Sequence, residues 1–320
     1  MMKLAIIFSI IFNTFGMGGV ANNIDKSIVT ERSGNDVSAH ASIQELVLPE
    51  LKEPPKLSNF TKQPSNIYAK YYLLMDPESD VVFSSNDENT KTAIASTTKI
   101  MTATIVLENY KLDDIVTISR EAAVQVGQDP TTKTGEKITV ENLLDVLLVI
   151  SSNRAAYALA EHINLPGETG TDKFVRMMNE KAKSLGMYNT DYHDPAGLDT
   201  TGYSTAHDLA IITEYAMQKP LFARIVGTAQ NSVTDITGKI VHELKNSNRL
   251  VSDWNYPGAL GVKTGYMPEA SHSLVAAAKR DNHTLYAIIL YTTYDTPEAS
   301  ATEARKLLDW GWANIDWGKN

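Results

Sequence analysis

A serine and a lysine three residues apart, Ser96 and Lys99, could act together as a nucleophile and its base. On a helix, residues i and i+3 are surface neighbours, so the hydroxyl and the amine would face the same way. This pairing would activate a serine without a histidine. Two later strings could complete the site. Ser151-Ser152-Asn153 offers a second hydroxyl and an amide, and Lys263-Thr264-Gly265 offers a second cation.

Each string is weak evidence alone, because a chain of this length should contain roughly one S-x-x-K and about one S-x-N by chance. Three further strings fit the same patterns: Ser33-Gly34-Asn35, Ser84-Ser85-Asn86 and Lys133-Thr134-Gly135. The first lies in a polar segment before the candidate nucleophile, the second in a predicted loop where a hairpin ends, and the third among polar residues. Lys263 instead precedes a predicted strand pair, where a strand edge can present its side chain.

Composition excludes several classes of function. The chain of 320 residues has no cysteine, which rules out disulfides, thiolate catalysis and Cys-ligated zinc. Its net charge of −9 and the lack of a basic, aromatic-interleaved stripe argue against a nucleic-acid partner. The seven histidines show no metal-ligand spacing, so neither a metal nor a cofactor is expected.

The N-terminus predicts export. Lys3 precedes an uncharged, largely apolar run that closes with small residues ending at Ala21. This pattern is typical of a signal peptide over residues 1–21, with an N-terminal membrane anchor as the alternative. Either reading places the rest outside the cytoplasm, secreted or periplasmic. Residues 22–65 are polar and aperiodic, which predicts a linker before a folded domain over 66–317.

The folded part predicts an α/β protein. The expected elements are a hairpin over 69–83, helices starting at Ser96 and over 140–150, 154–163, 172–185 and 205–217, strands over 274–278 and 285–291, and a last helix over 300–314. The apolar strands at the two ends would form one antiparallel sheet flanked by helices. A helical lobe inserted between them would leave a cleft at the junction, and Ser151 and Asn153 would occupy a helix-to-helix corner.

The chain resembles the serine D-alanyl-D-alanine carboxypeptidases, the low-molecular-weight penicillin-binding proteins, from about residue 66 to 316. The resemblance rests on the three strings, in that order, and on further segments at 134–144, 194–199, 203–210 and 246–250. It implies a serine β-lactamase/transpeptidase-like fold. It also implies peptidoglycan stem peptides as substrates and β-lactam antibiotics as inhibitors.

The resemblance assigns roles to the strings. Ser96 would attack the carbonyl that joins the last two D-alanines, and burial together with the charge of Lys263 would keep Lys99 neutral as the base. Ser151 would pass a proton to the departing amine. Asn153 would hold the substrate amide and orient Lys99.

The remaining assignments concern the third string. Lys263, Thr264 and Gly265 would hold the terminal carboxylate of the substrate, and the backbone N–H groups of Ser96 and Tyr266 would form the oxyanion hole. Tyr266 stands where several relatives carry histidine. Arg249 is a candidate for a further basic residue that contacts the carboxylate in some relatives.

The sequence leaves other readings open. An endopeptidase that cuts D-alanyl cross-links fits the same motifs. A class A β-lactamase deacylates with a glutamate, and the corresponding stretch over 187–199 has none. A non-enzymatic penicillin-binding module is disfavoured because Ser96 and Lys99 are both intact. No C-terminal β-rich domain is expected, so any membrane association would come from the N-terminal segment alone.

Overall fold

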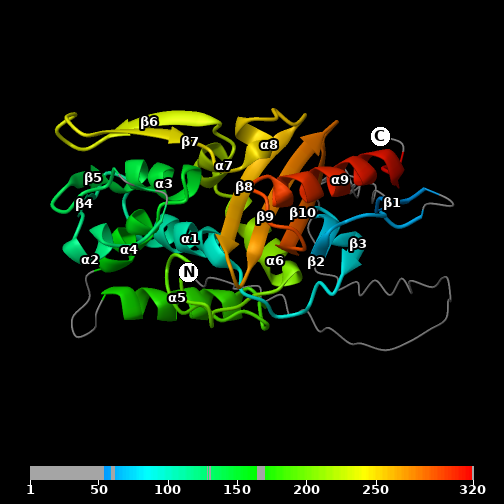
Figure 1. Cartoon of the computed structure of the whole chain (residues 1–320), viewed down its shortest axis with the longest axis horizontal. Helices are drawn as coiled ribbons and strands as arrows, with labels where there is room; N and C mark the ends of the chain where they lie inside the picture. Colours follow the sequence, from blue (N-terminus) through cyan, green and yellow to red (C-terminus); the bar gives the residue numbers. More distant parts are fainter. Residues whose placement is uncertain (1–53, 59–61, 128, 130, 164–169, 319–320) are drawn as a thin grey trace, which may run out of the picture. The chain divides into compact units, whose positions relative to one another are not determined.

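One antiparallel sheet of five strands, in the order β3-β2-β10-β9-β8, unites the two ends of the folded chain (Figure 1). Its strands are β2 Ala69–Asp76, β3 Val81–Asn86, β8 Ala259–Met267, β9 Ser271–Arg280 and β10 His283–Thr292. β2 pairs with β10, so that Leu73 lies opposite Ile288. The predicted α/β class, with a sheet built from both ends, is confirmed.

The adjacent strands β9 and β10 each contribute side chains to two separate hydrophobic cores. Val275 and Ile288 belong to one core, whereas their neighbours Leu274 and Ile289 belong to the other. Successive side chains of a strand point to opposite faces, so both faces of this sheet are covered. This explains why both strands read as continuous apolar runs instead of alternating.

Helices cover both faces of the sheet. On one face, α9 Ala299–Asn314 packs Leu307 and Leu308 against alternate residues of β9 and β10. On the other face, α1 Lys99–Asn109 and α6 Ala206–Met217 join the larger core (Figure 1). The helix predicted to begin at Ser96 is α1, but its first turn is a separate 3-10 helix, η1 Ala95–Thr98.

The predicted helical lobe lies between β3 and β8 in sequence. Besides α1 and α6, this region contains α2 Arg120–Ala123, α3 Val140–Val149, α4 Asn153–Glu161, α5 Gly170–Ser184, α7 Pro220–Val226 and α8 Arg249–Ser252. Two hairpins that the sequence reading did not predict complete it: β4 Ile115–Thr117 with β5 Lys137–Thr139, and β6 Gln230–Thr234 with β7 Val241–Lys245.

The computed structural model describes residues 54–58, 62–127, 129, 131–163 and 170–318. The predicted signal peptide and most of the predicted linker lie outside them. The end of the predicted linker belongs to the fold, because β1 Lys56–Leu57 pairs with β11 Ile315–Asp316. Among the described residues, no helix combines the length and apolarity needed to span a bilayer.

One sequence-based interpretation was wrong. Ser84-Ser85-Asn86 was expected to be loop at the end of the hairpin, yet all three residues belong to β3 and pair with β2. β3 is an edge strand, and at its end the Asn86 amide donates to the Lys70 carbonyl at 2.6 Å, whereas the buried Ser84 hydroxyl has no hydrogen-bond partner among the described residues. The string therefore has no position near the other motifs in the sheet order.

Candidate active site

The Lys99 amine lies within hydrogen-bond distance of the Ser96 hydroxyl. Nζ of Lys99 is 2.7 Å from Ser96 Oγ, 2.7 Å from Asn153 Oδ1 and 2.8 Å from the Ala196 carbonyl. The 3-10 turn η1 carries Ser96, and Lys99 opens α1, which keeps the i, i+3 spacing. Ser96 is therefore not a side-chain cap of the helix.

Burial and charge favour the neutral form of the Lys99 amine. The side chain is 0% exposed. Burial lowers the pKa of Lys99 well below its usual value, the positive charge of Lys263 lowers it further, and Asp194 opposes the shift. A neutral amine has two N–H groups and one lone pair. The N–H groups match the acceptors on Asn153 and Ala196, which leaves the lone pair for the proton of Ser96.

The backbone just before Ser96 is strained. Ala95 has φ of +47°, in the left-handed region that side chains with a Cβ seldom adopt. Two glycines hold this turn from either side. A Cβ on Gly197 would lie 1.9 Å from the Ala95 carbonyl oxygen, and a Cβ on Gly265 would lie 2.9 Å from that of Ile94. Only glycine lets these two segments approach the nucleophile so closely.

The loop that supplies the Ala196 carbonyl is braced from within. Asp194 is buried and accepts hydrogen bonds from the backbone N–H groups of Ala196, Gly197 and Asp199. Thr102 of α1 donates to the Pro195 carbonyl at 2.6 Å. These bonds fix the carbonyl that Lys99 contacts.

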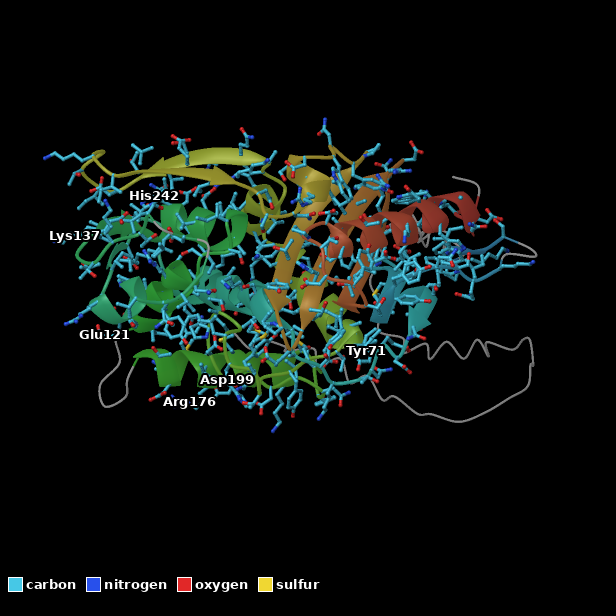
Figure 2. All side chains as sticks on the ribbon, viewed as in Figure 1. Tyr71, Glu121, Lys137, Arg176, Asp199 and His242 are labelled. Atoms are coloured by element: carbon cyan, nitrogen blue, oxygen red, sulfur yellow. The ribbon has the colours of Figure 1, made fainter. Side chains whose placement is uncertain are left out.

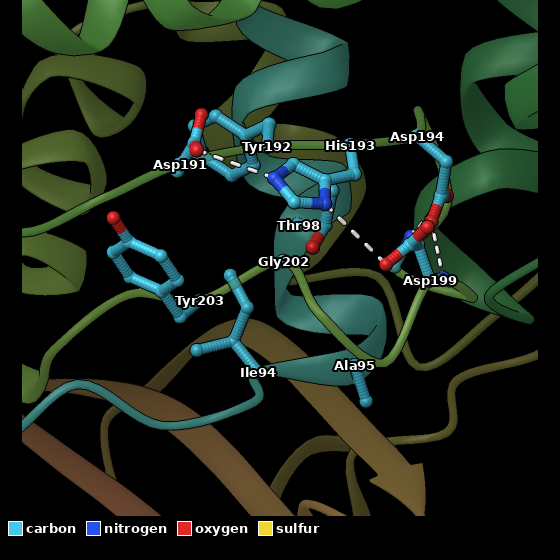
Figure 3. Close-up of a pocket in the computed structure, with 11 residues that line it drawn as sticks. Ile94, Ala95, Thr98, Asp191, Tyr192, His193, Asp194, Asp199, Gly202 and Tyr203 are labelled. Carbon is cyan, nitrogen blue, oxygen red and sulfur yellow. Dashed lines mark hydrogen bonds and ion pairs between the residues drawn. The ribbon is translucent and has the colours of Figure 1, made fainter.

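A small cavity lies beside this loop, and His193 on its wall connects two carboxylates of the loop (Figure 3). His193 lies between Asp191 and Asp199, 3.2 Å and 3.4 Å away. Although partial burial opposes it, these two carboxylates raise the pKa of His193 above its ordinary value. The cavity volume of about 10 Å³ fits one water molecule and no substrate.

The helix corner between α3 and α4 carries the second string. Ser151 has φ of +64°, and its side chain makes no hydrogen bond within the described part of the chain. Ser152 caps α4 and donates to the buried Asp129 carboxylate. Asn153 contacts Lys99 through its oxygen, while its nitrogen donates to the Val126 carbonyl. Both ends of this amide are thus fixed.

A buried polar network supports this corner from behind. Asp129 accepts hydrogen bonds from Ser152, Thr132 and Thr131, and Thr131 contacts His242 of β7 at 2.8 Å. His242 in turn contacts Glu136, and it lies over the β4–β5 end of the lobe (Figure 2). Burial raises the pKa of Asp129, but these hydrogen bonds outweigh it, so the pKa is lowered overall. The corner thereby rests on a charged, fully hydrogen-bonded carboxylate.

The edge strand β8 carries the third string. Lys263 is 1% exposed, and burial lowers its pKa to about 7. Its amine donates to the Thr264 carbonyl at 3.1 Å, and the Thr264 hydroxyl is 2.7 Å from that of Ser247. The other K-T-G string is a turn ahead of β5, with Lys133 and Thr134 exposed.

Two other candidate residues, Arg249 and Tyr266, have side-chain contacts of their own. Arg249 pairs with Asp253 at 3.0 Å and reaches the Pro297 carbonyl, and no contact joins it to Lys99 or Lys263 within the described part of the chain. The Tyr266 side chain is 54% exposed and lies against the ring of His272. Ser247 lies in the 246–250 segment of the resemblance but was given no role, and Asp129 was not singled out, because a single polar residue outside a motif carries no sequence signal.

Replacing Lys263 with methionine should stabilise the fold while it removes a candidate binding group. The pKa of Lys263 is about 7 in the folded state, below the ordinary value of 10.5. Below pH 7 the lysine is charged in both the folded and the unfolded state, so the full cost of burying its charge destabilises the fold. This penalty fades as the pH rises to 10.5. The free energy of unfolding should therefore rise by about 2 kcal/mol at pH 6 and change little at pH 10. Thermal melts at both pH values measure this, with exposed Lys279→Met as the control. A lower melting temperature at pH 6 would contradict it.

Comparison with known proteins places this geometry in a family. The sequence model described as D-alanyl-D-alanine carboxypeptidase matches residues 58–293. The carboxypeptidase DacF of Bacillus subtilis is 34% identical over 254 residues, covering 78% of this chain and 63% of that protein. A D-alanyl-D-alanine endopeptidase of Haemophilus influenzae is 32% identical over 250 residues, covering 76% and 82%.

A solved structure gives the same answer at the level of the fold. The Streptomyces DD-transpeptidase superposes with a TM-score of 0.74 at 32% identity, covering 79% of this chain and 100% of that one. The match spans both the sheet and the lobe, and the S-x-x-K serine, the S-x-N corner and the K-T-G strand lie within the matched residues 58–293. The chain belongs to the D-alanyl-D-alanine carboxypeptidase family.

Proposed function

We propose that this enzyme hydrolyses the bond between the last two D-alanines of peptidoglycan stem peptides through an acyl-enzyme on Ser96. The observation that carries the proposal is the buried Lys99 amine, 2.7 Å from the Ser96 hydroxyl and held by Asn153. A buried, neutral amine next to a serine hydroxyl is the arrangement that makes the hydroxyl a nucleophile. Because the substrate belongs to the cell wall, the enzyme acts outside the cytoplasm.

In the acylation step that we propose, these groups act in turn. The Ser96 oxygen bonds to the carbonyl carbon as its proton moves to the Lys99 amine. The backbone N–H groups of Ser96 and Tyr266 stabilise the resulting oxyanion, and loss of one such donor typically lowers the rate by about 10²–10³. The carbon–nitrogen bond then breaks, Ser151 passes a proton to the departing amine, and D-alanine leaves. Water hydrolyses the ester and restores the Ser96 hydroxyl.

The substrate carboxylate is held by the third string. The Lys263 amine and the Thr264 hydroxyl lie side by side on β8, and Ser247 adds a hydroxyl beside Thr264. A bound carboxylate favours the charged form of Lys263 and therefore raises its pKa from about 7. Gly265 keeps this strand close to the Ser96 turn. Arg249 is already paired with Asp253, so we assign it no contact with the carboxylate.

A β-lactamase is disfavoured by the loop over 191–199. Deacylation of a penicillin ester in class A enzymes uses a glutamate that activates water. The buried acid of this loop, Asp194, is instead occupied by three backbone N–H groups. Penicillins should therefore acylate Ser96 and leave slowly. An endopeptidase remains the second candidate, because two relatives, 32% and 33% identical to this chain, carry that name.

Product analysis tests the proposal. Purified enzyme is incubated separately with a stem pentapeptide and with a cross-linked peptide dimer, and products are identified by mass spectrometry. Faster release of D-alanine from the pentapeptide is expected. Faster cleavage of the dimer would assign the enzyme as an endopeptidase, and rapid turnover of penicillin would favour a β-lactamase.

A further inference from the structure

A second cavity opens at the end of the sheet next to the K-T-G strand. Its volume is about 430 Å³, large enough for a side chain or a small ligand. The charged, aromatic and proline residues that line this cavity are Lys70, Tyr266, Pro268, Tyr291, Tyr294 and Asp295. Tyr266 belongs both to this cavity and, through its backbone, to the proposed oxyanion hole. Tyr266 therefore links this cavity to the proposed oxyanion hole.

Two residues that line this cavity have strained backbones. Ser271 has φ of +49° and Tyr291 has φ of +57°, although neither is glycine. The register of β10 on β2 passes from Leu290 to Thr292, so Tyr291 is left out of the pairing. The Ser271 hydroxyl fixes this arrangement by donating to the Thr292 carbonyl at 2.8 Å. Strain of this kind, about 1–3 kcal/mol per residue, persists only where the surrounding structure enforces it, and it clusters at functional sites.

A substrate bound as in the proposed function would extend along β8 toward this cavity. This part of the inference rests on the proposed function. Lys263 holds the leaving D-alanine, and the Tyr266 N–H holds the carbonyl of the acyl D-alanine. The substrate therefore runs along β8 from Lys263 toward Pro268. Each extended residue advances about 3.4 Å, so the residue before the acyl D-alanine comes to lie beside Tyr266 and Pro268. The sugar of a stem peptide, several residues further on, lies beyond reach of this cavity.

The cavity wall carries one charge of each sign. The exposed Lys70 amine lies 3.5 Å from the centre of the Tyr291 ring. Asp295 contacts His272 at 2.9 Å, and the His272 ring lies 4.3 Å from that of Tyr266. Aromatic rings provide apolar contact for an aliphatic stem, whereas the ammonium and carboxylate groups bind their opposites. A long side chain that ends in an amino-acid head has this combination of groups.

We propose that this cavity is a specificity subsite for the side chain of the residue that precedes the acyl D-alanine. The side chain it selects is aliphatic and ends in an amino-acid head, whose carboxylate binds Lys70 and whose ammonium binds Asp295. Tyr266 and Tyr291 contact the aliphatic part.

Three tripeptides of the form N-acetyl-X-D-alanyl-D-alanine test the subsite, with X as glycine, L-lysine or meso-diaminopimelate. The readout is kcat/KM for D-alanine release. We expect diaminopimelate to exceed L-lysine by about 10-fold and L-lysine to exceed glycine by a smaller factor, because each charge pair contributes separately. Equal values for all three would overturn the subsite. No D-alanine release from any of them would overturn the proposed function itself.

Variants identify the two charges. Lys70→Met should reduce the ratio of diaminopimelate to L-lysine by about 5- to 10-fold, and Lys70→Glu should reverse it. Asp295→Asn should bring L-lysine down to the level of glycine. Exposed Lys111→Met and Asp113→Asn serve as matched controls, with ratios like those of the unchanged enzyme. Unaltered ratios in Lys70→Met would contradict the assignment, and melting temperatures confirm that every variant is folded.

Discussion

Replacing Ser96 with alanine should abolish both the covalent penicillin adduct and the release of D-alanine. The substitution removes the oxygen that forms the ester, so the rate should fall by at least about 10⁴-fold. The hydroxyl contacts only the Lys99 amine among the side chains described, so little stability is lost. The melting temperature should stay within about 3 °C. Intact-mass spectrometry after incubation with penicillin, together with a D-alanine assay, measures both effects.

A matched serine variant completes this experiment. Ser85 lies in β3, within a string that imitates the S-x-N pattern, and Ser85→Ala should leave adduct and activity unchanged. Peptide mapping of the unchanged enzyme should place the adduct on Ser96. A penicillin adduct that persists in Ser96→Ala, for example on Ser151, would show that the nucleophile is assigned wrongly.

Replacing Lys99 with methionine should lower kcat/KM by about 10³-fold or more. Methionine retains the length and burial of the side chain but has no proton-accepting nitrogen. It also leaves the Asn153 and Ala196 oxygens without their donor. The loss should appear mainly in the acylation rate, measured by stopped-flow with a chromogenic β-lactam. Lys133→Met, in the unused K-T-G string, is the control and should behave like the unchanged enzyme.

The same variant alters the pH dependence. In the unchanged enzyme kcat/KM rises with pH as Lys99 loses its proton, at a pKa well below the usual value for lysine. It falls again as Lys263, with a pKa of about 7 in the free enzyme, loses the charge that binds the substrate carboxylate. Lys99→Met should remove the rising limb and keep the falling one. A rising limb that survives the substitution would assign the base to another group.

Much of this arrangement could be predicted from the sequence, because motifs and hydrophobic periods are local signals. The strings at Ser96, Asn153 and Lys263, the helices that carry the first two and the strands after the third all follow from spacing. The carbonyl of Ala196 could not be predicted, since every residue has one and only the fold determines which of them faces Lys99.

The errors also have physical causes. Ser84-Ser85-Asn86 was interpreted as loop because all three residues are polar, but backbone pairing with β2 holds them in a strand. The hairpin that carries His242 was missed because its strands are short and mostly polar. Arg249, offered as a candidate for a basic residue that contacts the carboxylate in some relatives, stays a prediction; in the structure it pairs with Asp253, one helical turn later.

The pairing of β2 with β10 has a consequence for biosynthesis. Leu73 lies opposite Ile288, so a central ladder of the sheet joins the first of its strands in chain order to the last third of the chain. Contacts between such distant segments make folding slow. The ribosome completes Ser96, Asn153 and Lys263 before it has made β10, and the sheet that positions them cannot close until then. A nascent chain of this enzyme is therefore inert toward its substrate until synthesis is nearly finished.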